Sequence, residues 1–155
     1  MTAQPGEEHK HRIVVGVDGS VSSKAALAWA VRQARLTGAV VEAVTCWEFP
    51  TAYGYPAPVM DVDLEEMATN QVRAAISEAT RGAPPVQVRY LVAEGNDARV
   101  LLDASADADL LVVGSRGHGG FVEALPGSTG QHCVHHATCP VVVIRDSVTG
   151  QQDAG

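Results

Sequence analysis

Five short apolar runs recur along the chain and predict five β-strands. Most of them are rich in valine or isoleucine and show little alternation with polar residues. Continuous runs of this kind are typical of strands buried on both faces of a parallel sheet. The predicted strands are Ile13 to Val17, Val40 to Trp47, Val86 to Val92, Asp109 to Gly114 and Val141 to Ile144.

Amphipathic segments separate these runs and predict four helices. Ser20, Ser22 or Ser23 can cap the first helix, which continues to about Leu36 and stops at Gly38. The second is long and has an apolar stripe at helical spacing, which we expect to lie in the core. It extends from a cap at Asp61 to about Arg81, and its stripe comprises Leu64, Met67, Ala68, Val72, Ala75, Ile76 and Ala79.

The last two predicted helices are shorter, and both begin at polar caps. Asn96 or Asp97 caps the third, which extends to about Ala106. The segment Ser128 to Gln131 fits a capping box, in which the serine hydroxyl accepts from a backbone amide and the glutamine reaches back. The fourth helix therefore begins there and ends at about Ala137.

Strands that alternate with helices predict an α/β fold, a single doubly wound five-stranded parallel sheet in order 3-2-1-4-5 with helices on both faces. We expect one domain over residues 13–146, with disordered tails at 1–12 and 147–155. Such sheets bind ligands at the carboxyl ends of strands where the winding reverses. Asp18 and the segment from Gly114 should therefore face one crevice.

The segment from Glu48 to Met60 contains three prolines and two tyrosines and is predicted to be a loop. A connection of this length in a compact domain is more often functional or mobile than featureless.

The charge and cysteine content of the chain bear on its possible partners and on its cellular compartment. The formal net charge is −7, and the 11 Lys and Arg residues are scattered, which argues against a nucleic-acid partner. The three cysteines form no disulfide framework, as expected in a reducing compartment. The N-terminal segment lacks a signal-peptide core, and no apolar run is long enough to span a membrane. We therefore expect a cytoplasmic protein.

A glycine-rich segment between the fourth strand and the last helix predicts an anion site. Four glycines fall within the seven residues from Gly114 to Gly120, more than one tight turn requires. Glycines let backbone N–H groups approach a phosphate, and a helix N-terminus adds unpaired N–H groups. The segment has neither the G-x-G-x-x-G fingerprint nor the lysine of a P-loop.

The spacing instead fits G-x2-G-x9-G-[ST], with Gly114, Gly117, Gly127 and Ser128 at the fixed positions. With VGVDGS at 15–20, VVGSRGHGGF at 112–121 and QHCVHHATCPVVVIR at 131–145, the chain resembles the ATP-binding branch of the universal stress protein family. This resemblance covers residues 13–145 and implies a Rossmann-like, adenine nucleotide alpha-hydrolase-like fold.

The resemblance also implies roles at matching positions. Asp18 would lie near the ribose and phosphates or help to hold Mg²⁺, and the backbone of Cys46 would bind adenine. Arg116 and His118 are the side chains of the glycine segment that can supply positive charge. The implied ATP-binding residues are Gly16, Val17, Asp18, Cys46, Val113, Gly114, Ser115, Arg116, Gly117, His118, Gly119, Gly120, Gly127, Ser128 and Thr129. Alternatively, Asp18 only caps the first helix.

Three positions depart from the family pattern near the second half of the motif. Pro126 stands where an aliphatic residue is usual, Thr129 replaces a valine, and Gly130 replaces a small polar residue. Proline has no N–H to donate, and glycine weakens a helical first turn by about 1 kcal/mol relative to alanine. The glycine spacing is intact, whereas the affinity for ATP is left open.

These features favour a nucleotide-dependent stress-response module with at most slow ATP hydrolysis, since no general base or nucleophile is evident. One alternative is a nucleotide-hydrolysing enzyme, with Asp18 holding Mg²⁺ and His118 or Arg116 stabilising the leaving phosphate. Another is a family member that binds cyclic AMP or no nucleotide.

A metal site and a dimer interface are also predicted candidates. The possible metal ligands are His132, Cys133, His135, His136 and Cys139, although their spacing matches no recognised zinc pattern. The fifth strand should lie at the sheet edge, where an apolar strand is usually covered or paired. Pairing through Val141, Val142, Val143 and Ile144 with a second copy would form a symmetric homodimer, as the resemblance also implies.

Overall fold

A computed structural model describes residues 10–48, 51–52, 55–56, 63–82, 85–115 and 129–145. Its five-stranded sheet has the order β5-β2-β1-β6-β7, and every neighbouring pair is parallel. The strands are β1 (Arg12–Gly16), β2 (Val40–Trp47), β5 (Val88–Glu94), β6 (Leu110–Gly114) and β7 (Val141–Ile144). This is the predicted 3-2-1-4-5 order, so the fold class is confirmed.

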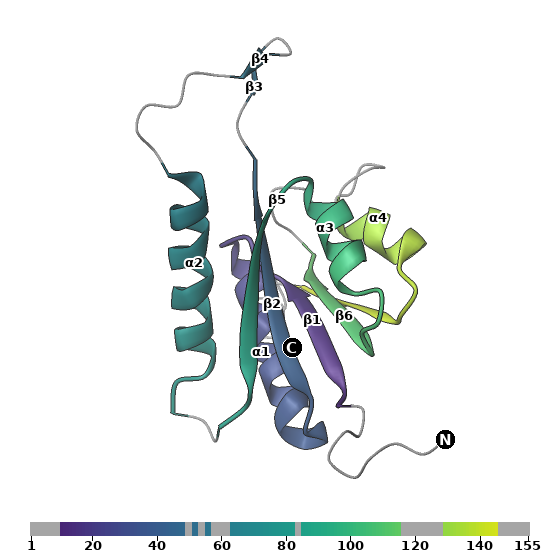
Figure 1. Cartoon of the computed structure of the whole chain (residues 1–155). Helices are drawn as coiled ribbons and strands as arrows, with labels where there is room; N and C mark the ends of the chain where they lie inside the picture. Colours follow the sequence, from purple (N-terminus) through teal and green to yellow (C-terminus); the bar gives the residue numbers. More distant parts are fainter. Residues whose placement is uncertain are drawn as a thin grey trace, which may run out of the picture.

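Alternate residues of β1 point to two different hydrophobic cores. Ile13 and Val15 pack with α1 (Val21–Thr37) and α2 (Leu64–Ala79), whereas Val14 packs with residues of α3 (Asp97–Ala104) and α4 (Thr129–His136). Figure 1 shows α1 and α2 as one layer and α3 and α4 as the other. Because both faces of β1 are covered, its inner valines are fully buried, as the apolar run predicts.

The first helix has the predicted start and stop. Ser20 is its N-cap, with the side chain accepting a hydrogen bond from Ser23 N, and Gly38 follows the last turn at φ 79°. The N–H of Gly38 donates to Ala34 O over 2.8 Å. Glycine suits this left-handed position because it has no Cβ to clash.

The second helix corrects two predictions. Its N-cap is Asp63, not Asp61, and the helix ends at Ala79 rather than near Arg81. Ala68, Val72 and Ala75 are buried as predicted, but Met67 is 58% exposed. Met67 lies at the margin of the apolar stripe, where helical spacing alone does not separate core from surface.

The segment between β2 and α2 contains a short antiparallel pair, β3 (Thr51–Ala52) and β4 (Tyr55–Pro56). In Figure 1 it stands beyond the carboxyl end of β2. The third strand of the main sheet begins at Val88, later than the predicted Val86, and extends to Glu94. These differences move element ends without changing the order of the fold.

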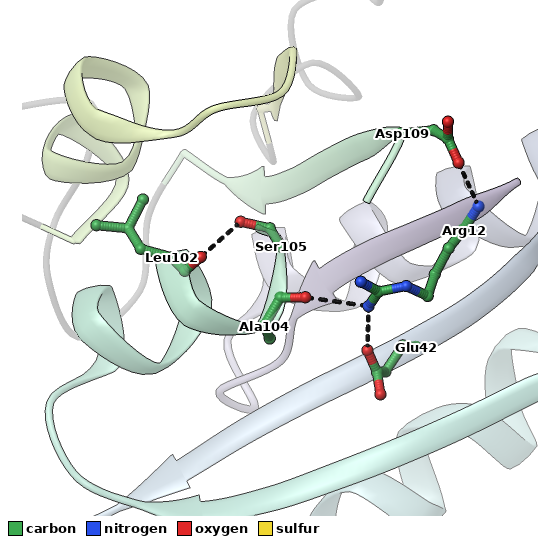
Figure 2. A network of polar contacts seen from close by, with 6 residues as sticks. All are labelled: Arg12, Glu42, Leu102, Ala104, Ser105 and Asp109. Carbon is green, nitrogen blue, oxygen red and sulfur yellow. Dashed lines mark hydrogen bonds and ion pairs between the residues drawn. The ribbon is translucent and has the colours of Figure 1, made fainter. Parts of the chain in front are cut away.

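The amino end of the sheet is joined by a polar network around Arg12 (Figure 2). Arg12 Nη1 donates to Glu42 Oε1 over 2.6 Å and to the carbonyl of Ala104 over 3.0 Å. The backbone N–H of Arg12 donates to Asp109 Oδ2 over 2.8 Å, and Asp109 N donates to Arg12 O over 3.0 Å. One residue thus links β1, β2, the end of α3 and the start of β6.

Candidate functional site

The carboxyl ends of β1 and β6 lie side by side at the point where the sheet reverses its winding. Ile13 pairs with Leu110 and Val15 with Val112, so both strands end at the same edge of the sheet. Residues 18 and 114, almost a hundred positions apart in sequence, therefore reach one region. The prediction that the first and fourth strands are neighbours is confirmed, and the ligand site at their ends stays a prediction.

Asp18 forms a tight turn at this edge rather than the helix cap. Its Oδ1 accepts from Ser20 N over 2.9 Å and from Ser20 Oγ over 2.6 Å. Its own N–H donates to Ser23 Oγ over 3.2 Å, and Gly19 between them adopts φ 86°. The cap of α1 is Ser20, so the alternative that Asp18 serves as the cap is wrong. The turn fixes a half-buried carboxylate just beyond the end of β1.

Gly114 is required by packing against the start of α1. A Cβ at this position would lie 2.5 Å from Ser22 Oγ, 2.7 Å from Ser22 C and 2.8 Å from Ser23 N. Two of these atoms belong to the backbone and cannot rotate away. The first glycine of the motif therefore lets the helix after Asp18 lie directly against the end of β6.

Ser115 places an unpaired hydroxyl at the same edge. Its N–H donates to Ile144 O over 2.7 Å, extending the ladder between β6 and β7. The side chain is 1% exposed, yet Oγ has no hydrogen-bond partner among the described residues. Buried polar atoms in folded proteins are nearly always paired, so this hydroxyl is a candidate to contact a ligand.

Gln131, which follows the glycine segment in the sequence, also carries a buried polar side-chain atom. Its Oε1 is buried without a hydrogen-bond partner in the described part of the chain. Ser128, its predicted capping partner, lies outside those residues. The start of α4 at Thr129 agrees with the predicted helix start, and the capping box itself stays a prediction.

Cys46 near the end of β2 faces Asp97 in the first turn of α3. The thiol donates a hydrogen bond to the Asp97 carboxylate. Burial, followed by the nearby Asp97 charge, raises the pKa of Cys46 to about 12. Cys133, with its pKa raised to about 11 mainly by burial, lies close enough to affect Cys46. Both thiols are therefore neutral near pH 7.

The sequence predictions considered Asp97 only as a possible helix cap and did not anticipate its position beside Cys46. Asn96 is the cap, since its side chain accepts from Arg99 N over 3.1 Å. The available signal was the position of Asp97 just after a predicted strand, at the ligand-binding edge of a parallel sheet.

The rest of the predicted site is described only in part. Gly16, Val17 and Val113 lie at the ends of β1 and β6, as expected, and Thr129 opens α4. Seven predicted residues lie outside the described ranges, namely Arg116, Gly117, His118, Gly119, Gly120, Gly127 and Ser128.

The histidine and cysteine segment of α4 does not form the alternative metal site. Cys133 is fully buried in the core, whereas His132 and His136 are exposed, with ring centroids 4.4 Å apart. Among residues with described positions, no group of three or more His, Cys, Asp or Glu side chains could hold a metal ion. The helix turns Cys133 and the histidines toward different surroundings.

The described helices include none that is both long and apolar enough to cross a membrane. All three cysteines, Cys46, Cys133 and Cys139, are free thiols.

Comparisons with known proteins agree with this architecture. The model of the universal stress protein family matches residues 10–145. A universal stress protein of Mycolicibacterium smegmatis is 32% identical over 94% of this chain and 51% of its own length. One from Mycobacterium bovis is 35% identical over 87% of this chain and 45% of its own length. The chain thus spans about half the length of these curated relatives.

Solved structures with the same fold include proteins described with nucleotides. The universal stress protein UspA from Lactobacillus plantarum superposes with a TM-score of 0.65 at 27% identity, covering 90% of this chain and all of that one. A universal stress protein in complex with cAMP gives a TM-score of 0.64 at 24% identity, covering 89% of this chain and 98% of that one. The second likeness concerns the fold alone.

Proposed function

Since this chain belongs to the universal stress protein family, we propose that it is an ATP-binding module whose nucleotide state regulates a stress response. The observation that carries the proposal is the convergence of Asp18, Gly114 and Ser115 at the reversal point of the sheet. The G-x2-G-x9-G-[ST] spacing adds the backbone donors that a phosphate needs. We place this activity in the cytoplasm.

Each part of the proposed site has a chemical role. The carboxylate of Asp18 suits ribose hydroxyls or a Mg²⁺ ion bound to the phosphates, because Mg²⁺ prefers carboxylate and phosphate oxygens. Ser115 Oγ can donate to or accept from a group that enters the crevice. The glycine segment and the start of α4 would surround the phosphates, and the end of β2 at Cys46 would adjoin the base.

Binding is better supported than turnover. Asp18 Oδ1 already accepts two hydrogen bonds from Ser20, which favours a positioning role over that of a general base. No lysine occurs between Gly114 and Thr129. We therefore propose slow hydrolysis at most, and rapid ATP turnover that depends on Asp18 would instead support the alternative of a hydrolase.

The test is isothermal titration of nucleotide-stripped protein with ATP and Mg²⁺, comparing the natural chain with Asp18→Asn. The asparagine oxygen can still accept from Ser20, so the turn is retained while the charge is lost. We expect micromolar binding by the natural chain and affinity weakened about 10-fold or more in the variant. Asp103→Asn, an exposed change on α3, is the control.

Equal affinity in Asp18→Asn and the natural chain would contradict the proposed site. Parallel titration with cyclic AMP distinguishes the second candidate ligand, because a preference for cyclic AMP would replace ATP in the proposal.

We also propose that β7 joins two copies into a homodimer. Leu111 N and Ser115 N donate to the carbonyls of Pro140, just before β7, and of Ile144, at its end. Every second residue counted from Pro140 therefore directs its backbone groups toward β6. Val141 and Val143 therefore direct their backbone groups to the free edge. An apolar edge strand with unpaired backbone groups favours pairing with another strand.

Val143→Pro tests the dimer with little disturbance of the sheet, because it removes an N–H that points away from β6. Sedimentation should show a dimer for the natural chain and for the control Val143→Thr, and a monomer for the proline variant. A monomeric natural chain at micromolar concentration would contradict the interface.

A further inference from the structure

The exposed face of α4 carries two histidines about one helical turn apart. His132 and His136 have the i, i+4 spacing at which side chains of a helix are neighbours. Their ring centroids lie 4.4 Å apart, and the ring planes are inclined by 37°. Both side chains are exposed, and neither has a hydrogen bond or an ion pair within the described ranges. Their ring nitrogens are therefore available to a ligand from solution.

The helix beneath these histidines is fixed to the rest of the fold. Cys133, which lies between them in the sequence, is fully buried in the core shared by α3, α4 and the sheet. The N–H of Ala137 donates to Cys133 O over 2.8 Å, and Thr138 Oγ1 in the following turn donates to Ala106 O over 3.3 Å. Because the backbone of the two histidines is already held in place, binding an ion orders little besides the two rings.

The distance between the rings suits two adjacent ligands of one metal ion. An imidazole nitrogen lies about 2.0 Å from a bound transition metal, which places the ring centroid roughly 3.2 Å from the ion. Two rings at right angles around the ion then have centroids about 4.5 Å apart, close to the observed 4.4 Å, whereas a tetrahedral arrangement requires about 5.2 Å. Adjacent positions at right angles are typical of Cu²⁺ and Ni²⁺.

This pair differs from the cluster of five possible ligands that the sequence suggested. The larger cluster needs Cys133, whose side chain is fully buried. A closed structural site takes about four protein ligands, whereas two imidazoles leave the other coordination positions to water. The formal net charge of −7 favours the approach of a cation. The pair therefore suits an open site that exchanges its ion with the solution.

We propose that His132 and His136 bind a divalent transition-metal ion of the Cu²⁺ and Ni²⁺ class through both imidazole rings, with water at the remaining positions. Imidazole is a favourable ligand for these ions, and a neutral ring has one nitrogen that accepts. The ion joins successive turns of α4, so it also stabilises this helix, which has only eight residues and contains Gly130. The site does not depend on the proposed nucleotide binding.

The first measurement is isothermal titration of the untagged full chain with Ni²⁺, after removal of metal by a chelator and without nucleotide. Ni²⁺ is the probe because, unlike Cu²⁺, it does not oxidise free thiols such as Cys46 and Cys139. We expect one ion per chain, bound on the order of 100-fold more weakly in His132→Gln and in His136→Gln, since each variant loses one of two points of attachment. Glutamine favours helices and both positions are exposed, so the fold should be retained.

Two other histidine variants are matched controls. His135→Gln changes an exposed histidine of the same helix, and His11→Gln removes the histidine whose Nδ1 lies 3.4 Å from Asp109 Oδ1. Both should bind Ni²⁺ with the affinity of the natural chain. Unchanged affinity in His136→Gln, lost affinity in either control, or no binding by the natural chain would each overturn the site.

Thermal melting gives an independent readout. Ni²⁺ should raise the Tm of the natural chain and of His135→Gln, and the rise should shrink in His136→Gln, because an ion that binds only the folded helix stabilises it. An equal rise in all three proteins would show that the ion binds elsewhere. Because no nucleotide is present, failure of these measurements overturns only the metal site and leaves the proposed ATP binding unaffected.

Discussion

The two ends of the sheet use polar groups in opposite ways. At the amino end, Arg12, Glu42 and Asp109 pair with one another or with backbone atoms across several elements. At the carboxyl end, Ser115 Oγ is buried without a partner in the described chain, and the Asp18 carboxylate is fixed by a local turn. The paired groups at the amino end contribute stability, whereas the buried hydroxyl of Ser115 at the carboxyl end supports the ligand site proposed above.

Helix direction reinforces this difference. Arg12 reaches the carbonyl of Ala104 at the end of α3, where the helix dipole favours a positive charge. The opposite ends of the helices begin near the carboxyl edge, as Ser20 and Asn96 do, and favour negative groups. The parallel sheet thus places stabilising cations at one end and anion-attracting helix starts at the other.

The largest loss of stability is expected from a substitution that disturbs packing at the carboxyl end of the sheet. Gly114→Ala would force its Cβ against the Ser22 and Ser23 backbone, so α1 must move, and we expect a loss of about 3 kcal/mol in unfolding free energy. Gly16→Ala is the matched control, because its Cβ would meet the Leu101 side chain at 3.0 Å, which can adjust. Urea unfolding measures both, and equal losses would contradict the backbone explanation.

A smaller effect is expected at the amino end. Arg12→Ala removes contacts to Glu42 and Ala104 and leaves a carboxylate whose side chain is only 22% exposed. We expect a loss of about 2 kcal/mol, below the range for fully buried pairs because water partly screens these groups. Urea unfolding gives the loss, and ATP titration should give an unchanged affinity. Weakened ATP binding in the folded variant would show that the two ends are coupled.

The smallest expected effects come from removing one buried serine hydroxyl at each end of the sheet. Ser115→Ala removes a buried hydroxyl that has no hydrogen-bond partner among the described residues, and it should raise the stability of the free protein by about 1 kcal/mol. Ser105→Ala should lower it by about 1 kcal/mol, because this fully buried hydroxyl donates to Leu102 O over 3.3 Å (Figure 2).

Thermal melting with and without ATP measures both serine variants. The stabilising shift produced by ATP should shrink in Ser115→Ala and persist in Ser105→Ala. The same sign of stability change in both variants would refute the contrast between the two ends of the sheet.

Element order and fold class could be predicted from the sequence because they depend on local patterns. Apolar runs, serine and asparagine caps and the glycine after α1 each act over a few residues. Local patterns were insufficient at margins, where Asp63 rather than Asp61 caps α2 and Met67 faces solvent. Two candidate caps that lie two residues apart have nearly the same local sequence signal. Buried and exposed positions at the edge of an apolar stripe are equally hard to distinguish from spacing alone.

The candidate site shows the same division. The sequence by itself determined the glycine spacing, the strand ends and the residue types available for a phosphate. The tertiary structure decided that Asp18 turns back on Ser20, that Gly114 receives the α1 backbone, and that the Cys46 thiol meets Asp97. The contacts of Gly114 and Cys46 join residues more than 50 positions apart, so they depend on the strand order and helix packing of the whole fold.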